Sequence, residues 1–164
     1  MFKVGDYVVH GRNGVCKVDD ITHVDITGAD KSQLYYILVP IHSESSKIFY
    51  PVDSDKVIMR IVISKKEAQN LIAEIKNIEP IEIENERQRE NQYKEEIGSC
   101  DCHRLIGVIK TLMERNRERM EQGKRATFLD DRYLKEAKRT LLDEFSIALG
   151  INIDDVENYI LSNI

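Results

Sequence analysis

The sequence predicts an α+β protein in which a small, highly curved β-sheet or barrel is followed by an all-α helical domain. Two observations predict this class. The first 60 residues contain five short segments rich in β-branched and aromatic residues, separated by tight polar connections. From Ser64 onward, apolar residues recur at the three- and four-residue spacing of a helix. We therefore place a domain boundary near residue 62, between domains spanning 1–62 and 63–164.

The N-terminal segments predict five strands. Their sequences are DYVVH, GVCKVDDITHVDI, QLYYILVPI, KIFYPV and KVIMRIV, covering residues 6–10, 14–26, 33–41, 47–52 and 56–62. The motif GRNG at 11–14 is typical of a turn between the first two strands. Pro40 and Pro51 are expected at strand ends or edges, because proline has no N–H to donate to a ladder. Five short strands with such connections favour one strongly curved sheet.

The helical half begins with a capping box. Ser64 precedes the helical pattern and Glu67 follows three residues later, the spacing at which the two side chains and the backbone N–H groups satisfy each other. Pro80 is expected to end this helix. The polar segment behind it is expected to be helical by Glu86.

The next helices are predicted to be long. Asp101 precedes an apolar stripe that starts at Cys102, and a carboxylate there can accept N–H bonds from the first turn. This helix is expected to run to about Gln122. A further helix is expected over 127–149, ended by a glycine, and a last short helix over 154–164.

Basic charge is concentrated in one part of an otherwise acidic chain. The 164 residues carry a formal net charge of −5, but residues 101–140 hold 11 Lys and Arg against 7 Asp and Glu, net +4. Arg132, Lys135 and Arg139 lie three, four and seven residues apart, so they share one helix face. Such a face can bind phosphates even on an acidic protein, because salt screens the more distant charges. Charge alone also fits a solvated helix with mixed ion pairs.

The motif SCDCHR at 99–104 raises a metal or redox hypothesis based on Cys100, Cys102 and His103. A structural zinc site takes four ligands, usually in two pairs, and the sequence has no second Cys or His pair. A thiol in the first turn of a helix can have a lowered pKa, so Cys100 is a candidate reactive thiol. Cys102 is expected to pack in the core. A thiol- or metal-sensing regulator stays open as the alternative function, although no metal site and no cofactor are predicted.

Other functional classes find no support in the sequence. It contains no glycine-rich phosphate loop, no nucleophile elbow and no His–carboxylate grouping of recognisable spacing, so no enzyme is predicted. The N-terminus has no signal-peptide pattern, and no run of about 18 apolar residues occurs. Three cysteines do not suggest a secreted disulfide framework. A cytoplasmic protein without membrane contact is expected.

Four segments resemble the CarD/CdnL family of bacterial transcription regulators: FKVGDYVVHGRNGVCKV, YPVDSDKVIMRIVIS, QYKEEIGSCDCHRLIGVIKTL and LKEAKRTLLDEFSIALG. The N-terminal part is also similar to the polymerase-binding module of transcription-repair coupling factors, and the helical half favours CarD/CdnL. The resemblance implies a Tudor/SH3-like β-barrel that binds the RNA polymerase β subunit. It also implies a helical domain that binds promoter DNA near the upstream edge of the melted bubble. Such regulators modulate the stability of the open complex and have no catalytic turnover.

The resemblance also implies where the two binding surfaces lie. Exposed main-chain groups on a strand edge can pair with a partner strand, and the polymerase-binding edge corresponds to the strand KIFYPV with the preceding hairpin. Its candidate residues are Val24, Lys47, Ile48, Phe49 and Tyr50. In the helical domain, Tyr93 and Lys94 match a family Tyr-Lys pair beside the DNA backbone.

Two positions depart from the family pattern. Many members carry a tryptophan wedge four residues before the Tyr-Lys pair, where this chain has Arg89. An apolar wedge unstacks a base step, whereas arginine can enter a narrow minor groove or hold phosphates. A family basic position near the start of the long helix is Asp131 here, so DNA contacts are expected to shift onto Arg132, Lys135 and Arg139.

The expected partners are therefore RNA polymerase and promoter DNA. Binding to DNA alone is expected to be weak and largely independent of sequence, because phosphate contacts dominate it. The protein is expected to associate with the nucleoid through the polymerase. It is expected to be a monomer or a dimer that exchanges its two modules.

Overall fold

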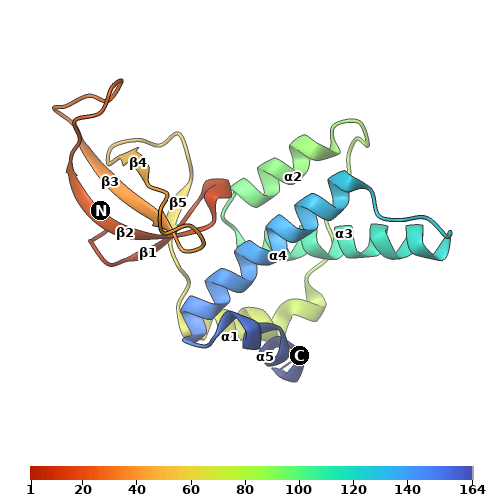
Figure 1. The fold of residues 1–164 in the computed structure, drawn as a ribbon. Helices are drawn as coiled ribbons and strands as arrows, with labels where there is room; N and C mark the ends of the chain where they lie inside the picture. The colour runs from red at the N-terminus through yellow and green to blue at the C-terminus, as the bar shows by residue number, and fades with distance from the viewer. Residues whose placement is uncertain (164) are drawn as a thin grey trace. The chain divides into compact units, whose positions relative to one another are not determined.

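The computed structural model describes residues 1–163, and the chain divides into two compact units, residues 1–62 and the residues from 63 onward. The first unit is an antiparallel five-stranded sheet and the second is built from five α-helices (Figure 1). The predicted α+β class, with a β domain followed by a helical domain, is confirmed.

The sheet of the first unit has the strand order β4-β3-β2-β1-β5. Its strands are β1 (Tyr7–His10), β2 (Val15–His23), β3 (Leu34–Pro40), β4 (Ile48–Pro51) and β5 (Met59–Ile61). The two edges are therefore β4 and β5. Pro51 closes the edge strand β4 and Pro40 closes β3, as expected for residues that cannot donate to a ladder. Strand β2 ends at His23, earlier than the predicted residue 26.

The GRNG motif forms a tight connection between β1 and β2. Residues Gly11–Asn13 make one turn of 3-10 helix, and the His10 N–H donates to the Gly14 carbonyl at 3.0 Å. Gly11 has φ +48°, and a Cβ added there would lie 2.5 Å from Val57 Cγ1. The close approach of the segment before β5 therefore requires glycine at this position.

The helical unit contains α1 (Lys65–Glu74), α2 (Arg89–Gly98), α3 (Cys102–Glu121), α4 (Phe128–Leu149) and α5 (Ile153–Asn163). The predicted capping box is present: the Ser64 hydroxyl accepts from the Glu67 N–H, and the Glu67 carboxylate accepts from the Ser64 N–H. Asp101 accepts from the N–H groups of His103 and Arg104 and caps α3, as predicted. Helix α2 starts at Arg89 and not at the predicted Glu86.

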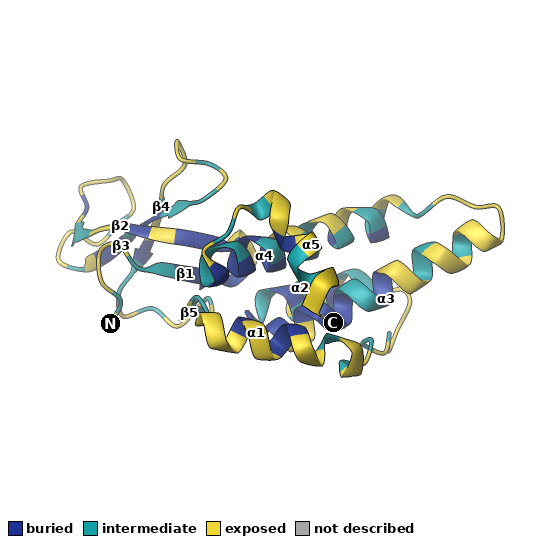
Figure 2. Ribbon diagram, turned by 90° about the horizontal axis from the view of Figure 1, so that it is seen from below, coloured by how far each residue is buried: buried dark blue, intermediate teal, exposed yellow. Residues whose placement is uncertain are grey.

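The core of the helical unit is centred on α3 and α4, and α1, α2 and α5 pack against them. Helices α3 and α4 run side by side (Figure 1), and their inward faces are buried, whereas the far half of α3 is largely exposed (Figure 2). Tyr93, Tyr133 and Phe145 are the largest side chains that are completely buried. The Tyr93 and Tyr133 rings lie 5.6 Å apart between centroids. Aromatic packing of this kind dominates the energetics of a small core.

An extended segment before α2 crosses α3 at a glycine. The Thr111 hydroxyl donates to the Ile81 carbonyl at 3.0 Å, and the Ile81 N–H donates to the Gly107 carbonyl at 3.4 Å. A Cβ on Gly107 would lie 3.0 Å from Ile81 Cγ2. The Lys110 ammonium donates to the carbonyls of Ile75 and Ile78. It thereby supplies a charged donor to carbonyl groups just beyond the end of α1.

The chain passes from the first unit to the second between Val62 and Ile63. The Val62 N–H donates to the Tyr7 carbonyl at 3.0 Å, within the first unit. The Ile63 N–H donates to the buried Glu144 carboxylate at 3.0 Å, within the second. Each unit therefore fixes its own side of the 62–63 peptide bond.

None of the helices over residues 1–163 combines the length and apolar character needed to cross a lipid bilayer.

Candidate functional site

Strand β4 forms one edge of the sheet and carries most of the residues predicted to bind polymerase. Phe49 is 38% exposed and points outward, and it lies opposite Ile37 in the ladder with β3. Lys47 precedes the strand and its ammonium lies 3.5 Å from the Asp19 carboxylate, with both side chains about half exposed. Ile48 is partly buried against the β core. The edge thus offers backbone groups, one aromatic side chain and one cation.

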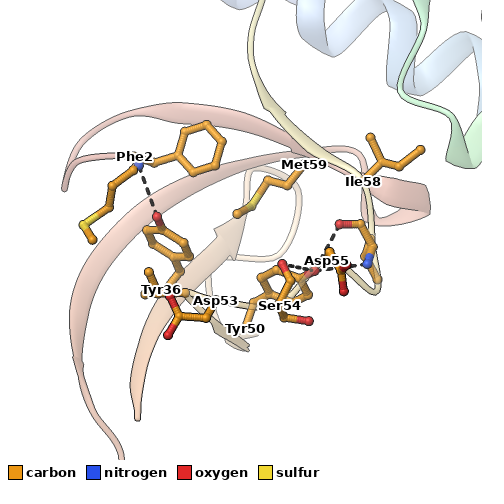
Figure 3. A pocket seen from close by; sticks show the side chains of 11 residues that line it. Phe2, Tyr36, Tyr50, Asp53, Ser54, Asp55, Ile58 and Met59 are labelled. Atoms are coloured by element: carbon orange, nitrogen blue, oxygen red, sulfur yellow. Dashed lines mark hydrogen bonds between the residues drawn. The ribbon is translucent and has the colours of Figure 1, made fainter.

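The other two predicted residues of this surface point inward. Tyr50 is 7% exposed and lines a hollow of the β unit together with Tyr36 and Met59 (Figure 3). Its hydroxyl donates to the Ser54 or Val57 carbonyl and accepts from the Val57 N–H at 3.0 Å. Val24 is also buried, at 7% exposure. Neither residue therefore presents its side chain on the surface of the edge.

A buried carboxylate organises the region around Arg89. Asp130, in the first turn of α4, is 0% exposed. Its Oδ1 accepts from the Tyr93 hydroxyl at 3.1 Å and from Arg89 Nε at 3.3 Å, and its Oδ2 accepts from Arg115 Nε at 3.3 Å. Arg115 also makes a two-bond contact with the Glu86 carboxylate, at 2.7 and 3.1 Å. One acid thereby joins the start of α2, the middle of α3 and the start of α4.

The ionisation of this cluster follows from its geometry. Burial by itself raises the pKa of Asp130, but the charge of Arg115 and hydrogen bonds with Thr127, Arg115 and Arg89 hold that pKa below its usual value. Burial and the Asp130 charge raise the pKa of Tyr93 to about 12. Near neutral pH, Asp130 is thus an anion held by two arginines and a neutral phenol.

The predicted DNA residues of α2 are engaged in this region. Arg89, with a side chain 23% exposed, is directed at Asp130 and also donates from its terminal nitrogen to the Glu86 carbonyl. Tyr93 is completely buried and does not reach the surface. Lys94 is 41% exposed and pairs with Glu90 at 3.0 Å. Of these three residues, Lys94 presents the most accessible cation.

The predicted basic residues of α4 lie together on the surface. Arg132, Lys135 and Arg139 are all exposed. Lys135 pairs with Asp131 of the previous turn at 2.8 Å, in an exposed contact that is weak in water. The Arg132 guanidinium lies 5.4 Å from the centroid of the Tyr133 ring. These residues form a row of cations along one face, which we call the α4 basic row.

The cysteines of the SCDCHR motif are buried. Cys100 is 6% exposed and adopts the left-handed region with φ 57°. The Cys102 thiol donates to the Glu144 carboxylate at 3.3 Å, so it packs in the core as expected. His103 is exposed, with its side chain near Glu74 at 3.7 Å. Within residues 1–163, no three His, Cys, Asp or Glu side chains are grouped so that they could hold a metal.

Sequence reasoning missed the residues that hold the site. Asp130 reads as an ordinary acid in the first turn of a helix, and Arg115 as one cation on the polar face of a helix. Their partners are 41, 37 and 15 residues apart in sequence, so no local pattern indicates them. Phe128 was also missed, although a local signal was present. Its position off the apolar stripe of α4 indicates that its ring faces water.

Comparison with known protein families agrees with the two units. A family model described as the CarD-like/TRCF RID domain matches residues 2–63, and a model described as the CarD C-terminal domain matches residues 67–161. Comparison with curated proteins gave no match. The second family match alone spans more than half of the chain, which confirms the resemblance seen in the sequence. The chain therefore belongs to the CarD/CdnL family of non-enzymatic transcription regulators that interact with RNA polymerase.

Proposed function

We propose that this protein binds the RNA polymerase β subunit through strand β4 and promoter DNA through its helical unit, and so changes the stability of the open complex. Its place in the cell would then be the cytoplasm, on the nucleoid, through the polymerase. The observation that carries the proposal is that β4 is an edge strand with an outward aromatic residue, inside the segment that matches a polymerase-interacting domain.

The chemistry of β4 supports strand addition. An edge strand has backbone N–H and C=O groups on its outer side, and a partner strand can pair with them. Phe49 on this edge supplies apolar area, and Lys47 supplies a charge that selects an acidic partner. Lys47, Ile48 and Phe49 are therefore the proposed contacts, while Val24 and Tyr50 hold the edge in shape.

The α4 basic row supports phosphate binding. Arg132, Lys135 and Arg139 are exposed and evenly placed along about two turns of helix. Lys94 of α2 is the further proposed phosphate contact. Arg89 and Tyr93 act by positioning, since both side chains are bonded to Asp130. Such contacts fix the protein on DNA without reading sequence.

Regulation then follows from differential binding. A protein attached to polymerase that touches DNA more extensively in the open complex than in the closed one shifts the balance toward the open complex. No chemical step is required for this effect. The size of the effect is set by the difference in binding free energy between the two states.

The test is binding of the full chain to a purified β-subunit fragment, measured by calorimetry. We expect Phe49→Ala to weaken binding about tenfold or more, as truncation of a central aromatic contact does. The matched control is Ile61→Ala, an exposed apolar residue on the opposite edge strand β5. Absence of binding by the unmodified protein, or an equal loss with both variants, would overturn the assignment of β4.

A further inference from the structure

Phe128 is exposed to an unusual degree for an aromatic residue. It is the first residue of α4 and is 84% exposed, more than any other large apolar residue of the described chain except Met1. The turn that carries it is rigid, because the Thr127 hydroxyl accepts from the Asp130 N–H at 3.1 Å and the Asp130 carboxylate is held by two arginines. A large apolar ring is thus presented to water from a fixed backbone.

Phe128 lies at the end of the α4 basic row. Arg132, Lys135 and Arg139 follow it by four, seven and eleven residues, which at about 100° per residue places all four side chains within roughly 60° of the helix circumference. All four are exposed. One strip of α4 therefore carries one aromatic ring followed by three cations. This combination suits a nucleic acid, whose phosphates pair with cations and whose bases or sugars contact aromatic faces.

The strip begins in the same turn of α4 whose buried face contacts the position where the family resemblance expects a wedge. Arg89 occupies that position, and its guanidinium is bonded to Asp130, only two residues after Phe128 along α4. Arg89 supplies no apolar surface for insertion. Phe128 supplies such surface at the same end of α4, without the ion pairs that hold Arg89.

We propose that Phe128 is the residue of this protein that packs against bases of promoter DNA at the upstream edge of the melted bubble, while the α4 basic row holds the adjoining phosphates. This inference rests on the proposed function, because it presumes that the helical unit is held on promoter DNA. It adds a specific contact at a position that the family resemblance does not assign. The ring stabilises the melted state because an unstacked base step exposes apolar surface that Phe128 covers.

The experiment compares variants in open complexes formed with polymerase on a promoter that carries 2-aminopurine at the upstream bubble edge. The measurements are the lifetime of the complex and the fluorescence of the probe. The variants are Phe128→Ala, Phe128→Trp and the matched control Met120→Ala, an apolar residue of α3 that is 71% exposed and lies outside the strip. Circular dichroism checks that each variant is folded.

We expect Phe128→Ala to reduce the protein-dependent gain in lifetime about fivefold or more and to change the probe signal, as loss of an aromatic contact with a base does. Phe128→Trp should retain or increase the gain, and Met120→Ala should leave it unchanged. A gain that is equal for Phe128→Ala and the unmodified protein would overturn the inference while leaving the proposed function intact. If the unmodified protein itself gave no change in lifetime, the proposed function would fail.

A second measurement separates DNA from protein as the partner of Phe128. Binding of each variant to polymerase without DNA is measured by calorimetry. We expect Phe128→Ala to bind as the unmodified protein does. Weaker binding in this assay would identify Phe128 as a contact to polymerase and would also overturn the inference.

Discussion

The Tyr93 hydroxyl donates a hydrogen bond to the Asp130 carboxylate at 3.1 Å, and both side chains are completely buried. Arg89 and Arg115 complete the shell of the same carboxylate from α2 and α3. The two residues of this Tyr-Lys pair are therefore placed differently. Tyr93 lies inside the helical unit, and Lys94 lies at its surface.

Asp130→Asn is expected to lower the free energy of unfolding by about 3 kcal/mol, because two arginines and a buried phenol lose the charge that they surround. Urea denaturation measures the change. The matched control is Asp131→Asn at the next residue, which removes only an exposed pair with Lys135. That variant should cost about 0.5 kcal/mol or less. Equal losses in the two variants would show that the cluster does not stabilise the fold.

Arg139→Ala is expected to weaken binding to duplex DNA to a similar extent for unrelated sequences, because a phosphate contact carries no sequence information. The dependence of log K on log salt should become shallower by about 0.9. Fluorescence anisotropy between about 50 and 200 mM salt measures both effects. Lys66→Ala, which removes an exposed cation of α1, should leave the slope unchanged.

Gly107→Ala is expected to destabilise the helical unit by about 1–3 kcal/mol through overpacking. The added Cβ would lie 3.0 Å from Ile81 Cγ2 and 3.2 Å from the Glu79 carbonyl oxygen. Truncation of Ile81 to alanine in the same chain should recover part of the loss, because one of the two close contacts then disappears. Thermal and urea unfolding of the single and double variants give the coupling, and strictly additive losses would contradict the assigned contact.

The β unit is expected to lose stability as pH falls from about 7.5 to 5.5. His10 is 3% exposed, and burial lowers its pKa from the usual value. Asn13 Nδ2 can only donate, so at 3.0 Å it donates to His10 Nδ1, and the buried Nε2 has no hydrogen-bond partner in the described chain. Well above pH 6.5 the ring is neutral in both states, whereas as pH falls through that value the unfolded chain binds a proton that the folded chain disfavours.

For one such group, the free energy of unfolding falls by at most about 1.4 kcal/mol per pH unit. Urea unfolding at several pH values measures it, and His10→Asn should flatten the profile while His23→Asn, at an exposed position, should not. The pKa values of Asp130, Glu86 and Glu90 are all lowered, so these carboxylates titrate below the pH window of the test. A profile unchanged by His10→Asn would exclude His10 as its source.

Local signals in the sequence predicted the elements of this fold well. The Ser64 capping box, the Asp101 cap and the Gly150 stop each depend on neighbours within a few residues, and the structure confirms all three. Burial of Cys102 also followed from helical periodicity. The start of α2 was predicted three residues early, because residues 86–88 are polar and make turn contacts before the helix begins.

The site was less predictable, because exposure depends on contacts that are distant in sequence. Family resemblance placed Arg89, Tyr93 and Lys94 on one DNA-facing surface, yet only folding shows that Arg89 and Tyr93 are directed at Asp130. In the same way, Tyr50 alternates inward along β4 while its neighbour Phe49 faces out. The alternation of side chains along a strand could have distinguished Phe49 from Tyr50. The Asp130 cluster, in contrast, forms only when α2, α3 and α4 pack together.

The changeover at Val62 and Ile63 bears on how the two proposed interactions combine. These consecutive residues are bonded into different units, so the polypeptide joins them directly and not through a long flexible spacer. Once one unit has bound its target, the local concentration of the other at its own target depends on the backbone torsions of a few residues. Glycines inserted at this junction would lower that local concentration without altering either surface. Simultaneous binding to both targets would then depend on the length of the inserted linker.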